Sequence, residues 1–289
     1  MLGILGKSIS TGIVTTSYPV TPPEVSRHTR GRPEIDWPNW ADVRPAAAVC
    51  PTGAISFQNS GQQRRASLDL GKCVFCGLCA GVDKSIRVTN VRECAARRRE
   101  ELVTTAAYLL KTDETHDRMV TPPSSPKPAV SAPLPPPGAS VEAIGQQIKE
   151  RVGKIFGRSL HIREVDAGSC NGCEIEIGGL NSPVYDIERF GIHFVASPRH
   201  ADMLLVTGPV TRNMELALKK TYDATPDPRL VVAVGACGCS GGIFGVNYAT
   251  RGAVDAVIPV DLYIPGCPPH PLTILDGVLR LLGKLEERR

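Results

Sequence analysis

The chain has 289 residues, ten cysteines and a net charge of +4, from 33 basic and 29 acidic side chains. Because this excess is small and aromatic residues make up only 5% of the chain, we do not expect nucleic acid as a partner. No segment approaches the roughly 18–20 apolar residues that span a bilayer, and the N-terminus lacks a signal-peptide core. We therefore expect a cytoplasmic protein, in which ten cysteines indicate metal or redox chemistry rather than disulfides.

The first motif is KCVFCGLCAGVDK, residues 72–84, where Cys73, Cys76 and Cys79 have the spacing of a bacterial ferredoxin. Such a run continues with three residues and a fourth cysteine followed by proline. The fourth position here is Asp83. Upstream, Cys50 precedes a proline and so has the ending of such a run, although the three preceding ligand positions hold other residues.

The two runs are followed by short apolar segments, 54–57 and 85–90, and so repeat one pattern. In two-cluster ferredoxins the fourth cysteine of each run binds the other run's cluster. The pattern therefore predicts one N-terminal 4Fe–4S site, formed by Cys50, Cys73, Cys76 and Cys79. The positions of a lost second cluster are held by Trp40, Val43, Ala46 and Asp83. A dead ferredoxin or a zinc site is the alternative, and Cys94 matches no motif.

Residues 119–139 contain eight prolines, a composition typical of an extended linker. They separate five cysteines from the other five, which predicts domains over residues 1–118 and 140–289. After the linker, Ser140 can cap a helix with one apolar stripe. We expect that helix to pack on its own domain; a docking helix for a partner or a membrane surface is the alternative.

Beyond this helix, apolar runs alternate with helical stretches and a last amphipathic helix covers residues 271–285. This order predicts a parallel, doubly wound α/β sheet. The runs are 160–165, 192–197, 202–208, 230–235 and 260–266.

Four C-terminal cysteines follow the ends of these expected strands: Cys170, Cys173, Cys237 and Cys267. Because parallel sheets form their sites outside the carboxyl ends of the strands, these loops can converge on one crevice. Four thiolates suit zinc or an iron–sulfur cluster, and the spacing alone does not choose between them.

The segments AGSCNGCEIEI, GACGCSGGIF and YIPGCPPHP resemble the cluster-binding signatures of the complex I 20 kDa subunit superfamily. Their first spacing resembles relatives in formate hydrogenlyase and membrane-bound NiFe hydrogenases. The resemblance covers about residues 158–285. It implies a flavodoxin-like fold with one 4Fe–4S cluster ligated by Cys170, Cys173, Cys237 and Cys267. Cys239 is then a spare thiol.

Around RGRPEID, roughly residues 12–110 resemble the ferredoxin-like electron-transfer subunit of formate hydrogenlyase-type complexes, which normally carries two clusters. The α+β ferredoxin-like region here is expected to hold one. Two further side chains draw attention near the C-terminal cysteines. Glu174 is either a proton relay or hydrogen-bonding group near the cluster, or a solvated carboxylate, and His270 is expected in an interface or core rather than as a ligand.

The sequence thus predicts a fusion of two electron-transfer modules with two 4Fe–4S clusters and no catalytic residues of its own. We expect the small subunit of a complex-I-related hydrogenase, peripheral on the cytoplasmic side of the membrane. Its expected partners are a large catalytic subunit (NiFe hydrogenase or complex I 49 kDa-like), membrane-arm subunits and a further ferredoxin-type or dehydrogenase subunit. The alternatives are a complex-I-like quinone oxidoreductase subunit and a zinc-binding structural or assembly protein.

Overall fold

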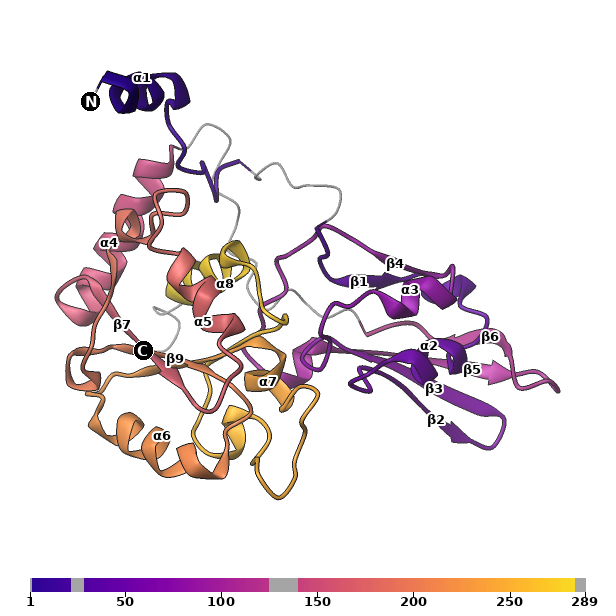
Figure 1. Ribbon diagram of the computed structural model, residues 1–289. Coiled ribbons are helices and arrows are strands. Elements are labelled where there is room, and N and C mark those ends of the chain that lie inside the picture. The colour runs from indigo at the N-terminus through magenta and orange to yellow at the C-terminus, as the bar shows by residue number, and fades with distance from the viewer. Residues whose placement is uncertain (1, 22–28, 125–139, 284–289) are drawn as a thin grey trace.

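The computed structural model describes residues 2–21, 29–124 and 140–283. It contains an N-terminal and a C-terminal unit that lie side by side (Figure 1). Strand β6 (His116–Thr121) extends three residues into the expected linker, because those residues pair with the neighbouring strand β5. The remainder of that proline-rich stretch, residues 125–139, lies outside the described residues.

The C-terminal unit contains a five-stranded parallel sheet in the order β11-β10-β9-β7-β8. Its strands are β7 (Leu160–Asp166), β8 (Ile192–Phe194), β9 (Met203–Thr207), β10 (Leu230–Val234) and β11 (Leu262–Ile264). All five expected strands are confirmed. Numbered along this unit, the order is 2-1-3-4-5, which is that of flavodoxin-like folds.

Helices cover both faces of this sheet, since residues along each strand alternate in direction. On β9, Met203 and Leu205 belong to the core beneath α4, α5 and α8, whereas Leu204 and Val206 belong to the core that includes α6 and α7. The helices are α4 (Val141–Phe156), α5 (Gly172–Gly179), α6 (Arg212–Ala224), α7 (Gly235–Ser240) and α8 (Pro271–Gly283), with 3-10 turns η3 (Ile187–Phe190), η4 (Pro198–His200) and η5 (Val254–Ala256).

Helix α4 begins as the sequence predicts. The Ser140 hydroxyl accepts a hydrogen bond from the backbone N–H of Ala143, which satisfies one of the free donors of the first turn. Ile148 and Val152 are buried in the core of the C-terminal unit. The expectation that this helix packs on its own unit is confirmed.

The N-terminal unit combines a two-stranded sheet with an antiparallel sheet in the order β2-β3-β5-β6. Strands β1 (Pro33–Ile35) and β4 (Ile86–Val88) form the first sheet, and β2 (Ile55–Ser60), β3 (Gln63–Asp69), β5 (Val103–Leu110) and β6 form the second. Two short helices, α2 (Arg44–Val49) and α3 (Leu78–Val82), lie between strands, with 3-10 turns η1 (Trp37–Asn39) and η2 (Arg99–Leu102).

Residues 15–18 contact the C-terminal unit, although the expected division assigned them to the N-terminal one. Helix α1 (Leu2–Thr11) is followed by an arm in which the Tyr18 hydroxyl donates to Asp276 on α8, at 2.7 Å. The Thr16 N–H also donates to the Val184 carbonyl. Among the described residues, no helix combines the length and apolarity needed to cross a membrane.

Candidate metal centres

The first candidate centre is formed by Cys50, Cys73, Cys76 and Cys79, which line one pocket of the N-terminal unit. Cys50 ends helix α2, and the other three precede and begin helix α3. The rest of the lining is largely apolar and includes Phe75, Leu68 and Val88. The structure therefore brings together the four cysteines that the repeat pattern assigns to one site.

The buried thiols of this set favour their neutral form. Burial, together with the charges of the other three thiols, raises the pKa of Cys73 to about 12. Burial also raises the pKa of Cys79. Thiolates are the form that binds metals, so the thiolate set needs positive charge beside it.

Two backbone amides already point at the sulfurs of this set. The Ala54 N–H donates to Cys50 Sγ at 3.2 Å, and the Phe75 N–H donates to Cys73 Sγ at 3.4 Å. Such hydrogen bonds to ligand sulfurs are one of the means by which proteins set cluster potentials. The donor set and its amide partners fit an iron–sulfur cluster.

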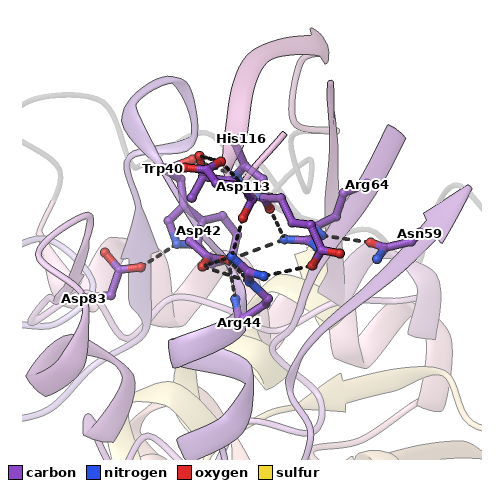
Figure 2. A network of polar contacts seen from close by, with 10 residues as sticks. Trp40, Asp42, Arg44, Asn59, Arg64, Asp83, Asp113 and His116 are labelled. Atoms are coloured by element: carbon purple, nitrogen blue, oxygen red, sulfur yellow. Dashed lines mark hydrogen bonds and ion pairs between the residues drawn. The ribbon is translucent and has the colours of Figure 1, made fainter. Parts of the chain in front are cut away.

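The positions that the sequence pattern assigns to a second cluster are filled by packed side chains, and the first and last of them are in contact. The Trp40 indole N–H donates to the Asp83 carboxylate at 2.6 Å, as Figure 2 shows. Val43 and Ala46 are fully buried in the same core as Trp40. The last residue of the second run therefore meets the first run, as the crossed pattern of a duplicated ferredoxin requires.

A polar network surrounds this filled site (Figure 2). The Arg64 side chain has no exposed surface, donates to the Asn59 amide oxygen at 2.8 Å and pairs with Asp42. Nδ1 of the buried His116 lies 2.7 Å from the Trp40 carbonyl oxygen. Hydrogen bonds and an ion pair between protein groups thus stabilise the backbone around Trp40.

The second candidate centre lies at the carboxyl ends of strands β7, β10 and β11. Cys170 and Cys173 follow β7, Cys237 lies in α7 after β10, and Cys267 follows β11. Burial raises the pKa of Cys237 to about 11, and it raises the pKa of Cys173 still further. The charges of Cys170 and Cys267 contribute in both cases, and that of Cys237 contributes to the shift of Cys173, so the four expected ligands are near neighbours.

Two glycines leave the space that these sulfurs occupy. A Cβ at Gly235 would lie 2.6 Å from Cys173 Sγ, and one at Gly242 would lie 2.8 Å from Cys237 Sγ. Both residues also have positive φ angles, which favour glycine. This cradle, together with four cysteines of which Cys170 and Cys267 are exposed, fits a cluster near the protein surface.

The described residues contain no three His, Cys, Asp or Glu side chains close enough together to hold one metal ion. The remaining cysteines lie apart from both sets as expected: Cys239 is buried with its thiol near the Ala233 carbonyl, and the thiol of buried Cys94 donates to the Arg92 carbonyl.

The two other side chains noted in the sequence have defined contacts. The Thr207 hydroxyl donates to Glu174, whose charge contributes to the raised pKa of both Cys173 and Cys237. His270 accepts from Arg92 of the N-terminal unit, and burial lowers its pKa to about 4. His270 thus lies at the contact between the two units, and its exclusion from the ligand set stays a prediction.

Comparison with known proteins places the C-terminal unit in a family. Residues 170–281 match the model of "NADH ubiquinone oxidoreductase, 20 Kd subunit". The "Probable membrane-bound hydrogenase subunit mbhJ" of Pyrococcus furiosus is 52% identical over 132 residues, which are 46% of this chain and 79% of that protein. The chain belongs to the NADH ubiquinone oxidoreductase 20 kDa subunit family. Members of this family are subunits of oxidoreductase complexes and bind an iron–sulfur cluster.

Two further 20 kDa family relatives carry different names. "Formate hydrogenlyase subunit 7" of Escherichia coli is 48% identical over 54% of this chain and 60% of its own length. A subunit of the NADH-quinone oxidoreductase of Desulfovibrio desulfuricans is 48% identical over 44% of this chain and 68% of its own length. The family therefore includes proteins named after hydrogenases and after quinone reductases.

Sequence reasoning missed one residue near the two centres. Arg99 donates to the Cys239 carbonyl, two residues after Cys237, and to Asp69, four residues before Cys73. In the sequence it is one of three consecutive arginines, and nothing in the pattern distinguishes it from Arg97 or Arg98.

Proposed function

We propose that this chain is the electron-transfer small subunit of a complex-I-related, membrane-bound hydrogenase of the formate hydrogenlyase type. It relays electrons between a large catalytic subunit and a donor or acceptor through one 4Fe–4S cluster in each unit. The carrying observation is that eight cysteines gather in two sets of four, one of them at the switch-point edge of a 20 kDa family sheet.

The N-terminal unit is, in this proposal, a ferredoxin-like domain with a single cluster held by Cys50, Cys73, Cys76 and Cys79. Its two ligand runs each end at the residue after a short helix, Cys50 after α2 and Asp83 after α3. The hydrogen bond from Trp40 to Asp83 supports the crossed pairing of the runs. With this pairing, replacement of the ligands at positions 40, 43, 46 and 83 removes one complete set, and the set of Cys50, Cys73, Cys76 and Cys79 stays complete.

The C-terminal cluster would be held by Cys170, Cys173, Cys237 and Cys267. Such clusters supply reversible one-electron transfer when bound. In both centres the chain's own residues ligate iron through thiolates. Glycines keep side chains away from the C-terminal sulfurs, and backbone amides point at the N-terminal ones.

A partner at the C-terminal centre is supported by exposed apolar side chains near its ligands. Ile175 lies two residues after Cys173, and the loop after Gly242 exposes four more. Exposed apolar groups of this kind mark protein interfaces when they cluster. The group comprises Ile175, Ile243, Phe244, Val246 and Tyr248. We assign this surface to the large catalytic subunit.

The same complex would hold the chain on the cytoplasmic side of the membrane through membrane-arm subunits, with a further ferredoxin-type or dehydrogenase subunit as an additional partner. A second candidate function is the equivalent subunit of a quinone oxidoreductase, which the Desulfovibrio desulfuricans relative favours. The hydrogenase is preferred because the relative from Pyrococcus furiosus is 52% identical over a comparable length.

The test is anaerobic purification of the tagged full chain with its partners, followed by identification of the large subunit and assays of hydrogen evolution and quinone reduction. The proposal predicts a large subunit with paired C-x2-C motifs, bound nickel and hydrogen evolution. Quinone reduction without nickel would establish the second function, and stoichiometric zinc with little iron would overturn both.

Two cysteines of helix α7 provide a matched pair for the relay. Cys237→Ala should lower hydrogen evolution by more than about tenfold, since even changes to outer-shell partners cost 10–100-fold. Cys239→Ala, two residues away, should retain activity because its buried thiol lies outside the ligand set. The reverse result would reassign the ligand.

A further inference from the structure

Residues 91–99, which we term the crossing segment, leave the N-terminal unit and lie on the edge of the C-terminal sheet. The Ala96 N–H donates to the Tyr263 carbonyl at 2.9 Å, and the Tyr263 N–H donates back to the Ala96 carbonyl at 2.7 Å. Strand β11, which contains Tyr263, is an edge strand of that sheet. The crossing segment therefore pairs with backbone groups that an edge strand otherwise leaves free.

Side chains of the crossing segment fit the C-terminal unit closely. A Cβ at Gly277 on α8 would lie 3.2 Å from the Ala95 Cβ, so glycine leaves the space that Ala95 needs. Arg92 donates to Nδ1 of His270 at 3.3 Å. Ala95 and Cys94 are both buried here. The contact between the units is thus packed and hydrogen-bonded.

Arg99, at the end of the crossing segment, contacts residues close in sequence to a candidate ligand in each unit. Its Nε donates to the Cys239 carbonyl at 2.8 Å, two residues beyond the ligand Cys237 in α7. Its Nη2 donates to Asp69 at 2.7 Å, four residues before the ligand Cys73.

The residues around Arg99 pack closely against its guanidinium group. A Cβ at Gly71 would lie 2.6 Å from its central carbon, so glycine leaves the space that the guanidinium occupies in this position. The side chain of Arg99 is 19% exposed and that of Asp69 is 15% exposed. A planar, bidentate donor in this position is more rigid than a lysine would be.

We propose that the crossing segment is the docking element that fixes the two centres relative to each other, with Arg99 as its positioning residue. The distance and orientation between the two centres then depend on the crossing segment and not on the proline-rich stretch. The statement about electron relay rests on the proposed function, whereas the docking itself does not. A guanidinium near an anionic cluster also favours its reduced form, even where a carboxylate such as Asp69 partly offsets the charge.

The test uses the full chain with a tag at the C-terminus and two inserted protease sites, one between residues 130 and 131 and one between residues 24 and 25, so that the arm of Thr16 and Tyr18 does not hold the halves together. After cleavage, the halves should stay together on the affinity column and keep the EPR signals of the uncut protein. Arg99→Met should weaken the association of the cleaved halves about tenfold, as loss of a buried interfacial arginine does. Arg99→Lys, which keeps the charge, should lie between.

Arg98→Met is the matched control, because the neighbouring Arg98 is 76% exposed and bonds only within its own turn, to Glu101. In the uncut chain, Arg99→Met should lower the reduction potential of at least one cluster and weaken the magnetic interaction between them, whereas Arg98→Met should change neither.

Separation of the wild-type halves after cleavage would overturn the proposal. So would an Arg99→Met protein that matches the control in association, potentials and magnetic interaction. If the halves stay together but contain zinc, the docking stands and the proposed electron transfer fails. If iron is present and the halves separate, the proposed function stands and the docking fails.

Discussion

The N-terminal repeat contains two sets of four equivalent positions, and each set draws on both halves of the repeat. In one set, four partly exposed cysteines line a pocket. In the other set, the equivalent positions hold Trp40, Val43 and Ala46, each at most 1% exposed, and Asp83. One set thus presents thiols to a pocket, whereas the other is filled by packed side chains.

Apolar packing alone does not satisfy the positions filled by Trp40, Val43, Ala46 and Asp83. The Trp40 indole N–H and nearby backbone groups also need hydrogen-bond partners. Asp83 accepts from the Trp40 indole and from the backbone N–H of Ser85, at 2.8 Å. Buried donors that lose such partners cost free energy. The set of positions without cysteines is therefore a small packed core with a hydrogen bond between Trp40 and Asp83. We expect its stability not to depend on metal.

The largest expected effect comes from restoring the lost ligands. The variant Trp40→Cys, Val43→Cys, Ala46→Cys and Asp83→Cys should gain about four irons per chain, because the four positions already converge. Iron and sulfide analysis after anaerobic reconstitution measures this gain. A folded variant that binds no more iron than the wild type would show that the two halves are not equivalent.

Trp40→Ala should destabilise the N-terminal unit by about 3–5 kcal/mol, since it leaves a large cavity in a closed core. Anaerobic denaturant unfolding followed by far-UV circular dichroism measures the change. The iron content of the folded variant should stay that of the wild type. A cost below about 1 kcal/mol would mean that Trp40 does not support this half.

Asp83→Ala should cost about 1–3 kcal/mol, because the Trp40 indole N–H loses its acceptor inside the protein. The same unfolding assay applies, and Asp83→Asn, which keeps an acceptor oxygen, should recover most of the loss. Equal stability of the alanine and asparagine variants would show that the Trp40–Asp83 hydrogen bond does not contribute to stability.

A smaller effect concerns pH. Burial lowers the pKa of His116 below its usual value near 6.5, so the unfolded chain binds the proton more readily. Stability is then fully present above that value and is lost as pH falls toward the folded pKa. His116→Phe, which keeps a ring beside Tyr108, should flatten this dependence.

The two tryptophans, Trp37 and Trp40, both lie in this half, and their rings are 5.4 Å apart. Their fluorescence therefore measures the pH dependence of unfolding locally. His193→Gln is the control, since His193 is 39% exposed in the other unit. An unchanged pH profile in the His116 variant would assign the acid sensitivity to other groups.

The sequence predicted the C-terminal sheet well because its strands are continuous apolar runs in a parallel, fully covered sheet. It also predicted that Trp40 and Asp83 belong together, because ligand spacing in a repeat carries three-dimensional information. Strand β5 was not predicted: it alternates, but its buried positions include Thr104 and Ala106, which give a weak signal.

Contacts between the units could not be predicted at all. The pair of Tyr18 with Asp276 joins residues 258 positions apart, and the contact of Arg99 with Cys239 joins residues 140 apart. No local pattern encodes either contact, since each depends on how two finished units meet. These contacts decide how far apart the two candidate centres lie.

The central claim is one cluster on each side of the proline-rich stretch, and iron and sulfide analysis with EPR of the anaerobically purified chain tests it most directly. The account predicts about eight irons and two cluster signals, with about four irons and one signal in the Cys50→Ser variant. About twelve irons in the wild type, or zinc in place of iron, would contradict it.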